Sequence, residues 1–209
     1  MLDVSALSFQ YEDLSLLEEI SFTVNRGELF HIHGENGTGK TTLLRLLAGL
    51  LQPCEGEIRY QGRSIYAMET SYSQSICYIG HRLGIHPLLT VRENCQVDPH
   101  YRSNFKQEEA LCALNLTGLE EIPCKQLSTG QQRRVSLLRL FITRAPVWIL
   151  DEPLVGLDLL GIQRLMQLFE KHLNQKGILI VTSHQSLPVA FSSERHFFID
   201  KLAQSRVAK

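Results

Sequence analysis

The stretch "GENGTGKT", residues 34–41, carries the residue types that hold a polyphosphate. It fits the pattern G-x-x-x-x-G-K-[ST], in which glycines let backbone N–H groups wrap around phosphate oxygens. Lys40 is expected to hold the β- and γ-phosphates, and the Thr41 hydroxyl to bind Mg²⁺. A strand-like run, "ELFHIHG" (28–34), precedes the loop, and leucines at helical spacing follow it, which gives anions a helix N-terminus. The pattern therefore predicts a nucleotide site, with a merely structural glycine turn as the weaker alternative.

Two acids form a second chemical group at the end of the apolar run "VWILDEP" (147–153). Asp151 is expected to hold Mg²⁺ through water, and Glu152 to act on the attacking water as a general base. Two acids after a strand are common in α/β proteins, so this pair becomes specific only beside the phosphate loop. His184, in "TSH" (182–184), ends another apolar run and is a candidate contact for the γ-phosphate, with a structural histidine as the alternative.

The elements that must position these residues follow an α/β pattern. The continuous apolar runs "VWILDEP" and "GILIVTSH" (177–184) predict strands of a parallel sheet that is covered on both faces. The segments "KQEEALCALNLTGL" (106–119) and "GQQRRVSLLRLFIT" (130–143) predict helices. The early stretch at 7–24 predicts an antiparallel hairpin. We therefore expect a nucleotide-binding core with an N-terminal β subdomain and a mainly helical insertion.

Composition bounds the function class. The 209 residues include 21 Lys and Arg against 22 Asp and Glu, which argues against a nucleic acid as the main partner. The five cysteines contain no C-x-x-C pair, so free thiols are expected rather than disulfides or a zinc site. No segment approaches the ~18 consecutive apolar residues that span a bilayer. The first ten residues lack the pattern of a signal peptide.

A further polar stretch, "LSTGQQRRV" (127–135), precedes the acid pair. Together with the phosphate loop, the acids and "TSH", it resembles the ATP-binding cassette (ABC) family in content and order. The resemblance covers essentially the whole chain. It implies one P-loop ATPase domain, with a core at 1–81 and 142–209 and a helical subdomain at 82–141.

The same resemblance implies a role for each matching residue, and ATP and Mg²⁺ as cofactors. ATP contacts are implied at Tyr11, Gly34, Glu35, Asn36, Gly37, Thr38, Gly39, Lys40, Thr41 and Thr42. Signature contacts to the ATP of a second subunit are implied at Leu127, Ser128, Thr129, Gly130 and Gln131. Catalytic roles are implied for Lys40, Glu152 and His184, Mg²⁺ ligation for Thr41 and Asp151 with His81 as a further candidate, and a dimer contact for Asp158. Tyr11 is expected to stack on adenine, and an ordinary strand tyrosine is a close alternative.

Two positions depart from the family pattern. Thr129 stands where the signature usually has glycine, although Ser128 and Gly130 are retained. His81 stands where the family has a glutamine that senses Mg²⁺ and water and couples the site to the membrane partner. A histidine can ligate, and its ordinary pKa near ~6.5 would make this coupling sensitive to pH.

Within the family, the chain looks most like the ATP-binding subunits of the haem exporter in bacterial cytochrome c maturation. That implies a homodimer bound to integral membrane transporter subunits, peripheral on the cytoplasmic face of the inner membrane, which acts indirectly on a haem chaperone. One alternative is the ATPase of an exporter for another cargo, such as a lipid, lipoprotein or drug. Others are a soluble ABC ATPase of DNA repair or translation, and a regulator that signals through ATP-driven dimerisation.

Two further groups are expected to be structural. His31 and His33 lie two residues apart on one strand, and with no Cys, Asp or Glu joining them a packed or partly solvated pair is expected rather than a metal site. Arg133, Arg134 and Arg139 are expected on a solvated or partner-facing side of their helix.

Overall fold

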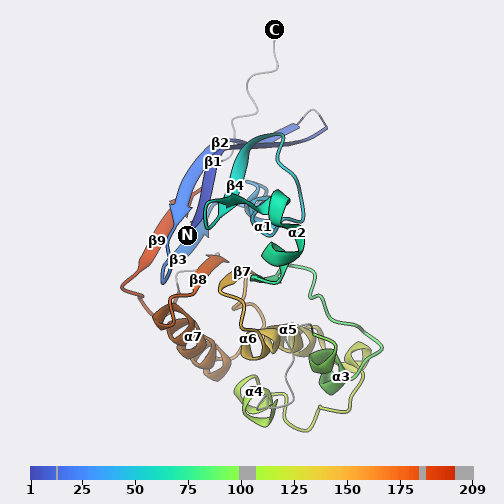
Figure 1. Cartoon of the computed structure of the whole chain (residues 1–209). Helices are drawn as coiled ribbons and strands as arrows, with labels where there is room; N and C mark the ends of the chain where they lie inside the picture. Colours follow the sequence, from blue (N-terminus) through green and yellow to red (C-terminus); the bar gives the residue numbers. More distant parts are fainter. Residues whose placement is uncertain (13, 99–106, 184–186, 201–209) are drawn as a thin grey trace.

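A computed structural model describes residues 1–12, 14–98, 107–183 and 187–200. Figure 1 shows two sheets beside each other in one half of the molecule, and a group of helices in the other half. None of the helices in the described ranges is both long and apolar enough to cross a membrane.

The central sheet is parallel throughout, as the continuous apolar runs predicted. Its strands, in spatial order, are β6 (Ile76–Ile79), β7 (Val147–Asp151), β8 (Ile178–Thr182), β3 (Leu29–His33) and β9 (Glu194–Phe198). The carboxyl ends of β3, β7 and β8 therefore meet at one edge of the sheet. This edge carries the phosphate loop and the acid pair.

Alternate residues of these strands enter two different cores. Phe30 and Ile32 of β3 pack with the leucines of α1 (Lys40–Leu47) and with the antiparallel sheet. Leu179 and Val181 of β8 pack instead with α7 (Leu159–Asn174) and the helical half. The sheet is thus covered on both faces, which explains why its strands read as unbroken apolar runs.

The second sheet confirms the predicted antiparallel hairpin. Its strand order is β2 (Leu14–Val24), β1 (Leu2–Tyr11), β4 (Glu55–Tyr60) and β5 (Arg63–Ser64). A Cβ at Gly56 would lie within 2.4 Å of the Ser5 carbonyl oxygen, so only glycine lets β4 approach β1 this closely. Helix α2 (Ile65–Ser73) follows this sheet and leads into β6.

The helical half differs in detail from the prediction. It contains α3 (Val91–Gln96), α4 (Gln107–Ala113), the 3₁₀ turn η1 (Cys124–Gln126), α5 (Thr129–Leu137) and α6 (Arg139–Ile142). The helix expected at 130–143 divides at Leu138, where the backbone switches to tighter i→i−3 hydrogen bonds on both sides. Helix α1 also stops earlier than its leucines suggest, because Gly49, at φ +70°, terminates it.

Candidate active site

The phosphate loop joins β3 to α1 and is shaped by two glycines. Gly37 and Gly39 have φ values of +84° and +98°, a region that favours glycine. A Cβ at Gly39 would also lie 2.9 Å from Leu17 Cδ2, whereas Gly37 faces open space. The backbone at Gly37 is therefore free of side-chain atoms and accessible to a ligand.

Lys40, the first residue of α1, is fixed across the mouth of this loop. Its Nζ donates to the carbonyl oxygens of Gly34, at 2.6 Å, and Glu35, at 2.8 Å. The Glu35 carbonyl also accepts from Thr38 Oγ1 at 3.0 Å. A cation and the N-terminus of α1 thus converge on one small volume, which suits a phosphate group.

Asp151, the last residue of β7, is hydrogen-bonded to α1 and to the neighbouring strand β8. Its Oδ2 accepts from Thr41 Oγ1 at 2.8 Å, and its Oδ1 accepts from Thr182 Oγ1 at 2.7 Å. Asp151 is buried, at 4 % exposed. A hydroxyl and a carboxylate side by side are the hard oxygen ligands that Mg²⁺ prefers, so these residues fit that ion.

Glu152 follows directly in an unusual backbone conformation. Its φ is +50°, and its N–H donates to the carbonyl oxygen of Thr182 at 3.2 Å and to the hydroxyl oxygen at 3.1 Å. The positive φ turns the chain sharply after β7, so that the side chain of Glu152 leaves the sheet and lines the same cleft as Lys40.

The expectation that Arg133 lies on a solvated or partner-facing side of its helix is wrong. Its side chain is buried, and its guanidinium donates to the carbonyl oxygens of Gly80 at 2.8 Å, Glu152 at 3.0 Å, and Asp151. Burial lowers the pKa of Arg133, while Asp151 and Glu152 act in the opposite direction. An arginine turned inward from α5 therefore connects the end of β6 to the acid pair.

Arg139 also turns inward, against expectation. Its Nε donates to Asp98 Oδ2 at 2.9 Å, and its Nη1 to the Tyr78 carbonyl oxygen at 3.1 Å. The charge pattern of the helix gave the wrong prediction because the hydrogen-bond acceptors of both guanidinium groups include backbone carbonyls outside this helix, which the local sequence does not show. Arg134 is half-buried.

The signature stretch forms the start of α5. Ser128 is its N-cap: Oγ accepts from the Gln131 N–H at 3.2 Å, and the Gln131 side chain accepts from the Ser128 N–H at 2.8 Å. This capping box fixes the helix N-terminus, with Thr129 and Gly130 in its first turn. Leu127 is buried beneath it.

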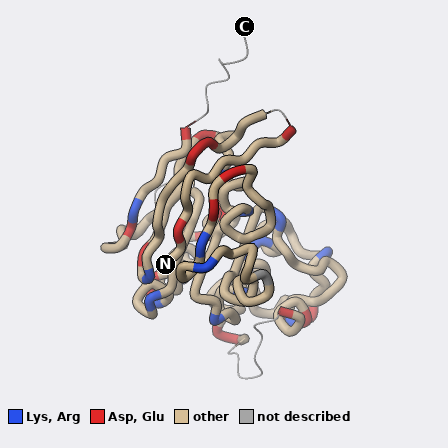
Figure 2. The backbone as a smooth tube through the Cα atoms, turned by 45° about the horizontal axis from the view of Figure 1, so that its top comes forward, with Lys and Arg blue, Asp and Glu red and all other residues tan. Residues whose placement is uncertain are grey.

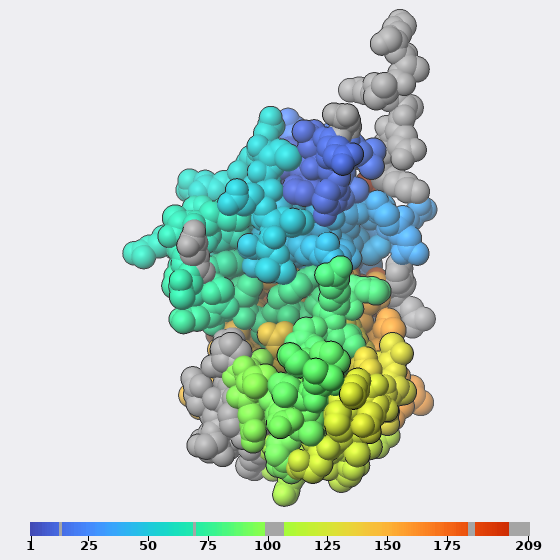
Figure 3. Space-filling view, turned by 90° about the vertical axis from the view of Figure 1, so that its right-hand side faces the viewer, coloured from blue at the N-terminus to red at the C-terminus, as the bar shows by residue number. Residues whose placement is uncertain are grey.

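One cleft of about 1010 Å³ brings most of the predicted residues together. In Figure 3 the green and yellow helical part lies below the blue to cyan part, with orange residues visible between them. Predicted residues that line the cleft are Asn36, Gly37, Gly39, Lys40, Thr41, Thr42, His81, Thr129, Gly130, Asp151 and Glu152. Residues that sequence reasoning missed are Leu16, Arg82, Leu83, Arg133, Val155 and Gly156.

Other predicted residues lie elsewhere. Tyr11 is 46 % exposed at the end of β1 and does not line the cleft. Its ring packs edge-on against that of Phe9, with 4.8 Å between the ring centroids. Asp158 is exposed and caps α7, where its Oδ1 accepts from the Gly161 N–H at 2.8 Å. His184 lies outside the described residues.

His31 and His33 form the expected packed pair, with ring centroids 3.9 Å apart, but an acid does join them. His31 Nδ1 lies 3.1 Å from Glu194 Oε1, and His33 Nε2 lies 2.8 Å from His196 Nδ1. Both partners come from β9, an edge strand whose short, mixed sequence gave no clear period. The thiols are as expected, with five free cysteines in the described ranges.

Charged residues of both signs are interspersed over the described backbone (Figure 2). The cleft also contains both signs of charge: Lys40, Arg82 and Arg133 lie beside the two acids. Cations for phosphate oxygens and carboxylates for a metal ion suit a metal-bound polyphosphate.

Comparison with known proteins identifies the family to which the chain belongs. The ABC transporter family model matches residues 17–155. A cytochrome c biogenesis ATP-binding export protein, CcmA, from Legionella pneumophila is 47 % identical over 190 residues, which cover 90 % of this chain and 95 % of the relative. The structure resembles that of a dimeric bacterial ABC transporter cassette, with a TM-score of 0.80, 26 % identity, and coverage of 96 % and 95 % of the two chains. It also resembles a dimeric cassette in a post-hydrolysis state bound to ADP and Pi, with a TM-score of 0.75, 25 % identity and coverage of 88 % of each. The chain therefore belongs to the ABC transporter family, as an ATP-binding subunit that hydrolyses ATP, and groups with the CcmA proteins.

Proposed function

We propose that this ATPase serves the haem exporter of c-type cytochrome biogenesis and couples ATP binding and hydrolysis to haem delivery or to release of a haem chaperone. The observation that carries the proposal is the single cleft that holds Lys40, Thr41, Asp151 and Glu152, in a chain 47 % identical to a protein named for cytochrome c biogenesis and ATP-binding export.

Within the cleft, Lys40 binds the β- and γ-phosphates in place of the loop carbonyls that it contacts here. Thr41 and Asp151 hold Mg²⁺, which when bound supplies positive charge that stabilises the phosphate oxygens. Glu152 orients the attacking water and accepts its proton as the water oxygen bonds to the γ-phosphorus, while the bond from that phosphorus to the β–γ bridging oxygen breaks and ADP leaves. His184 is proposed to contact the γ-phosphate, on the basis of family resemblance. His81 is proposed to lie beside Mg²⁺ and the water, and its position on the cleft wall supports this role.

The signature of each subunit would complete the other subunit's site in a homodimer. Support comes from the N-terminus of α5, where the capping box holds Ser128 while Gly130 faces the cleft. The dimeric state of two similar cassettes is consistent with this arrangement. Asp158, exposed at the start of α7, is proposed to contact the second subunit, and Tyr11 to stack on adenine.

The membrane partners are proposed to dock on the helical part at 82–141, treated as a subdomain separate from the core at 1–81 and 142–209. Exposed Leu88 and Val97 in this part offer apolar contacts. The subunit would then lie peripherally on the cytoplasmic face of the inner membrane, held there by integral membrane subunits and acting on the haem chaperone through them.

The test is to purify the membrane complex through this subunit and to identify its partners. Loading of the acceptor chaperone with haem is then measured for the wild type and for Lys40→Met. We expect integral membrane partners and loss of loading in the variant. Recovery of ribosomal or DNA-repair components, or loading that does not depend on Lys40, would exclude the proposed function.

A further inference from the structure

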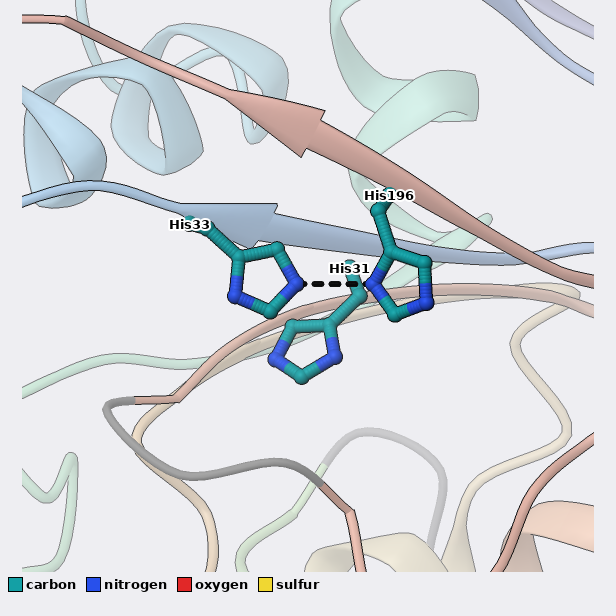
Figure 4. A group of neighbouring side chains, drawn as sticks. All are labelled: His31, His33 and His196. Atoms are coloured by element: carbon teal, nitrogen blue, oxygen red, sulfur yellow. Dashed lines mark hydrogen bonds between the residues drawn. The ribbon is translucent and has the colours of Figure 1, made fainter.

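Three histidines gather on one face of the parallel sheet, outside the nucleotide cleft. His31 and His33 stand on β3, and His196 stands beside them on β9, where the parallel register pairs it with His31. One ring nitrogen of each lies within 4.8 Å of the others. Figure 4 shows the three rings grouped together, with His31 below the hydrogen-bonded pair. Two strands thus bring three potential metal ligands into a single cluster.

The environment of His31 prepares one nitrogen for ligation. Its side chain is fully buried, and its Nδ1 lies 3.1 Å from Glu194 Oε1. A carboxylate accepts hydrogen bonds, so the ring proton is assigned to Nδ1, and Nε2 keeps its lone pair. That Nε2 is buried with no hydrogen-bond partner among the described residues. A buried nitrogen left unpaired costs free energy, which a bound cation would recover.

The pairing of Glu194 with His31 has a known chemical meaning. Histidines that ligate metals commonly donate their second ring N–H to a carboxylate, which orients the ring and makes the ligating nitrogen more basic. Glu194 is mostly buried, with a side chain 12 % exposed, and so it is held in place beside His31. Its negative charge also offsets part of the charge of a bound ion.

The three rings must adjust to share one ion, because their nitrogens lie within 4.8 Å of one another rather than at one common spacing. His33 Nε2 and His196 Nδ1 are 2.8 Å apart, whereas two nitrogens on a tetrahedral ion with bonds of about 2.0–2.1 Å lie roughly 3.3 Å apart. The His196 side chain is 51 % exposed, so it has room to rotate, and its exposed side gives an ion access from solvent.

We propose that His31, His33 and His196 form a binding site for Zn²⁺ or a chemically similar first-row transition ion, oriented by Glu194. Three imidazole nitrogens suit Zn²⁺, Cu²⁺ or Ni²⁺, whereas Mg²⁺ and Ca²⁺ require oxygen ligands. The site is therefore distinct in chemistry from the oxygen ligands Thr41 and Asp151. Water on the exposed side of His196 would supply the fourth ligand.

The position of the site gives the ion a structural consequence. His33 directly precedes Gly34, the first residue of the phosphate loop, and β9 is the edge strand of the sheet. An ion shared by β3 and β9 fixes the edge strand to the strand that carries the loop. Because it binds the folded chain, it also raises the melting temperature with increasing metal concentration.

The experiment titrates ZnCl₂ into the purified chain in the presence of excess Mg²⁺, which occupies the oxygen sites, and uses CoCl₂ as a spectroscopic probe. All variants are made in a Cys54→Ser, Cys112→Ser background, because these two exposed thiols also bind soft metals. Affinity comes from competition with a chromophoric chelator. The d–d absorption of Co²⁺ reports tetrahedral coordination.

We expect His196→Ala to weaken Zn²⁺ binding by at least ~100-fold and Glu194→Gln by about 10- to 100-fold, the usual effect of losing a carboxylate that orients a ligating histidine. The matched control is His86→Ala, which removes an exposed histidine outside the cluster and should leave affinity unchanged. Circular dichroism in the absence of metal verifies that each variant is folded. Wild-type binding weaker than about 0.1 mM, or equal affinity of wild type and His196→Ala, would overturn the proposal.

Discussion

Thr41 Oγ1 donates a hydrogen bond to Asp151 Oδ2 at 2.8 Å, although 110 residues separate them in sequence. Thr41 belongs to α1, which follows β3 and the phosphate loop, and Asp151 is the last residue of β7. Strands β3 and β7 lie on opposite sides of β8. The parallel order of β7, β8 and β3 brings the two together, so the phosphate loop and the acid pair are parts of one site.

Glu152→Gln should lower ATP hydrolysis by about 10²- to 10⁴-fold, because the amide keeps the shape of the side chain but cannot accept the proton of water. The affinity for ATP should change little, since Lys40 and the loop are intact. Steady-state hydrolysis and equilibrium binding of a fluorescent ATP analogue measure the two quantities. Undiminished turnover would remove Glu152 from the chemical step.

Ser128→Arg should allow ATP to bind each monomer yet prevent the ATP-bound dimer, because a bulky cation at the N-cap of α5 blocks the approach of a second subunit. The control Ser73→Arg places the same charge on an exposed position of α2, away from the cleft. Light scattering with ATP in the Glu152→Gln background gives the oligomeric state. A dimer that still forms in Ser128→Arg contradicts the assignment of the signature.

Arg133→Lys should destabilise the fold by about 1–3 kcal/mol, because an ammonium cannot reach all the carbonyl oxygens of Gly80, Asp151 and Glu152 and leaves some unpaired. It should also lower kcat, because it loosens the backbone that orients Glu152. The matched control is Arg164→Lys on the exposed side of α7, which should be neutral. Urea unfolding and steady-state kinetics separate the two effects, and a variant as stable as wild type would show that Arg133 is dispensable.

His172 predicts a dependence of stability on pH. Burial lowers its pKa to about 4. Its ring stacks on that of Trp148, with 3.9 Å between the ring centroids, and its Nε2 lies 3.1 Å from the Ile178 carbonyl oxygen. In the unfolded chain the ring binds its proton near pH 6.5, so between about pH 6.5 and 4 the unfolded state holds more protons. The free energy of unfolding should therefore fall as pH falls through this window, by about 3 kcal/mol from this group.

The variant His172→Phe keeps an aromatic ring beside Trp148 but removes the titration. Its free energy of unfolding should lose part of the slope between pH 6.5 and 4, while His31 and His33 retain theirs. An identical slope in wild type and His172→Phe would show that His172 is not the group responsible.

Much of the site is predictable because local patterns carry it. The glycines and Lys40 lie within a few residues of each other, so their spacing identifies them. Asp151 ends an apolar run, and it becomes specific only beside the phosphate loop. Their meeting in space follows from the parallel sheet. Helix α7 was not predicted, although Leu165, Phe169 and Leu173 follow a helical spacing and are buried. Asp158, for which a dimer contact was expected, caps this helix.

Other features depend on contacts that no local pattern shows. Arg133 reads as a surface residue because its charge is costly to bury without partners, and those partners come from β6 and β7. Glu194 and His196 lie 163 residues from their partners on β3, on an edge strand that has little periodicity. In both cases the hydrogen-bond partner comes from a distant part of the chain, and this partner offsets the cost of burying a polar side chain in the protein interior.

The left-handed backbone of Glu152 sets activity against stability at one position. A glutamate at φ +50° costs the folded state on the order of 1 kcal/mol relative to a glycine, which adopts this conformation without strain. Glu152→Gly should therefore melt at a higher temperature than wild type while hydrolysing almost no ATP. For thermal stability alone a glycine is favoured at this position, so the strained backbone of Glu152 is a cost that the proposed general base adds to the folded state.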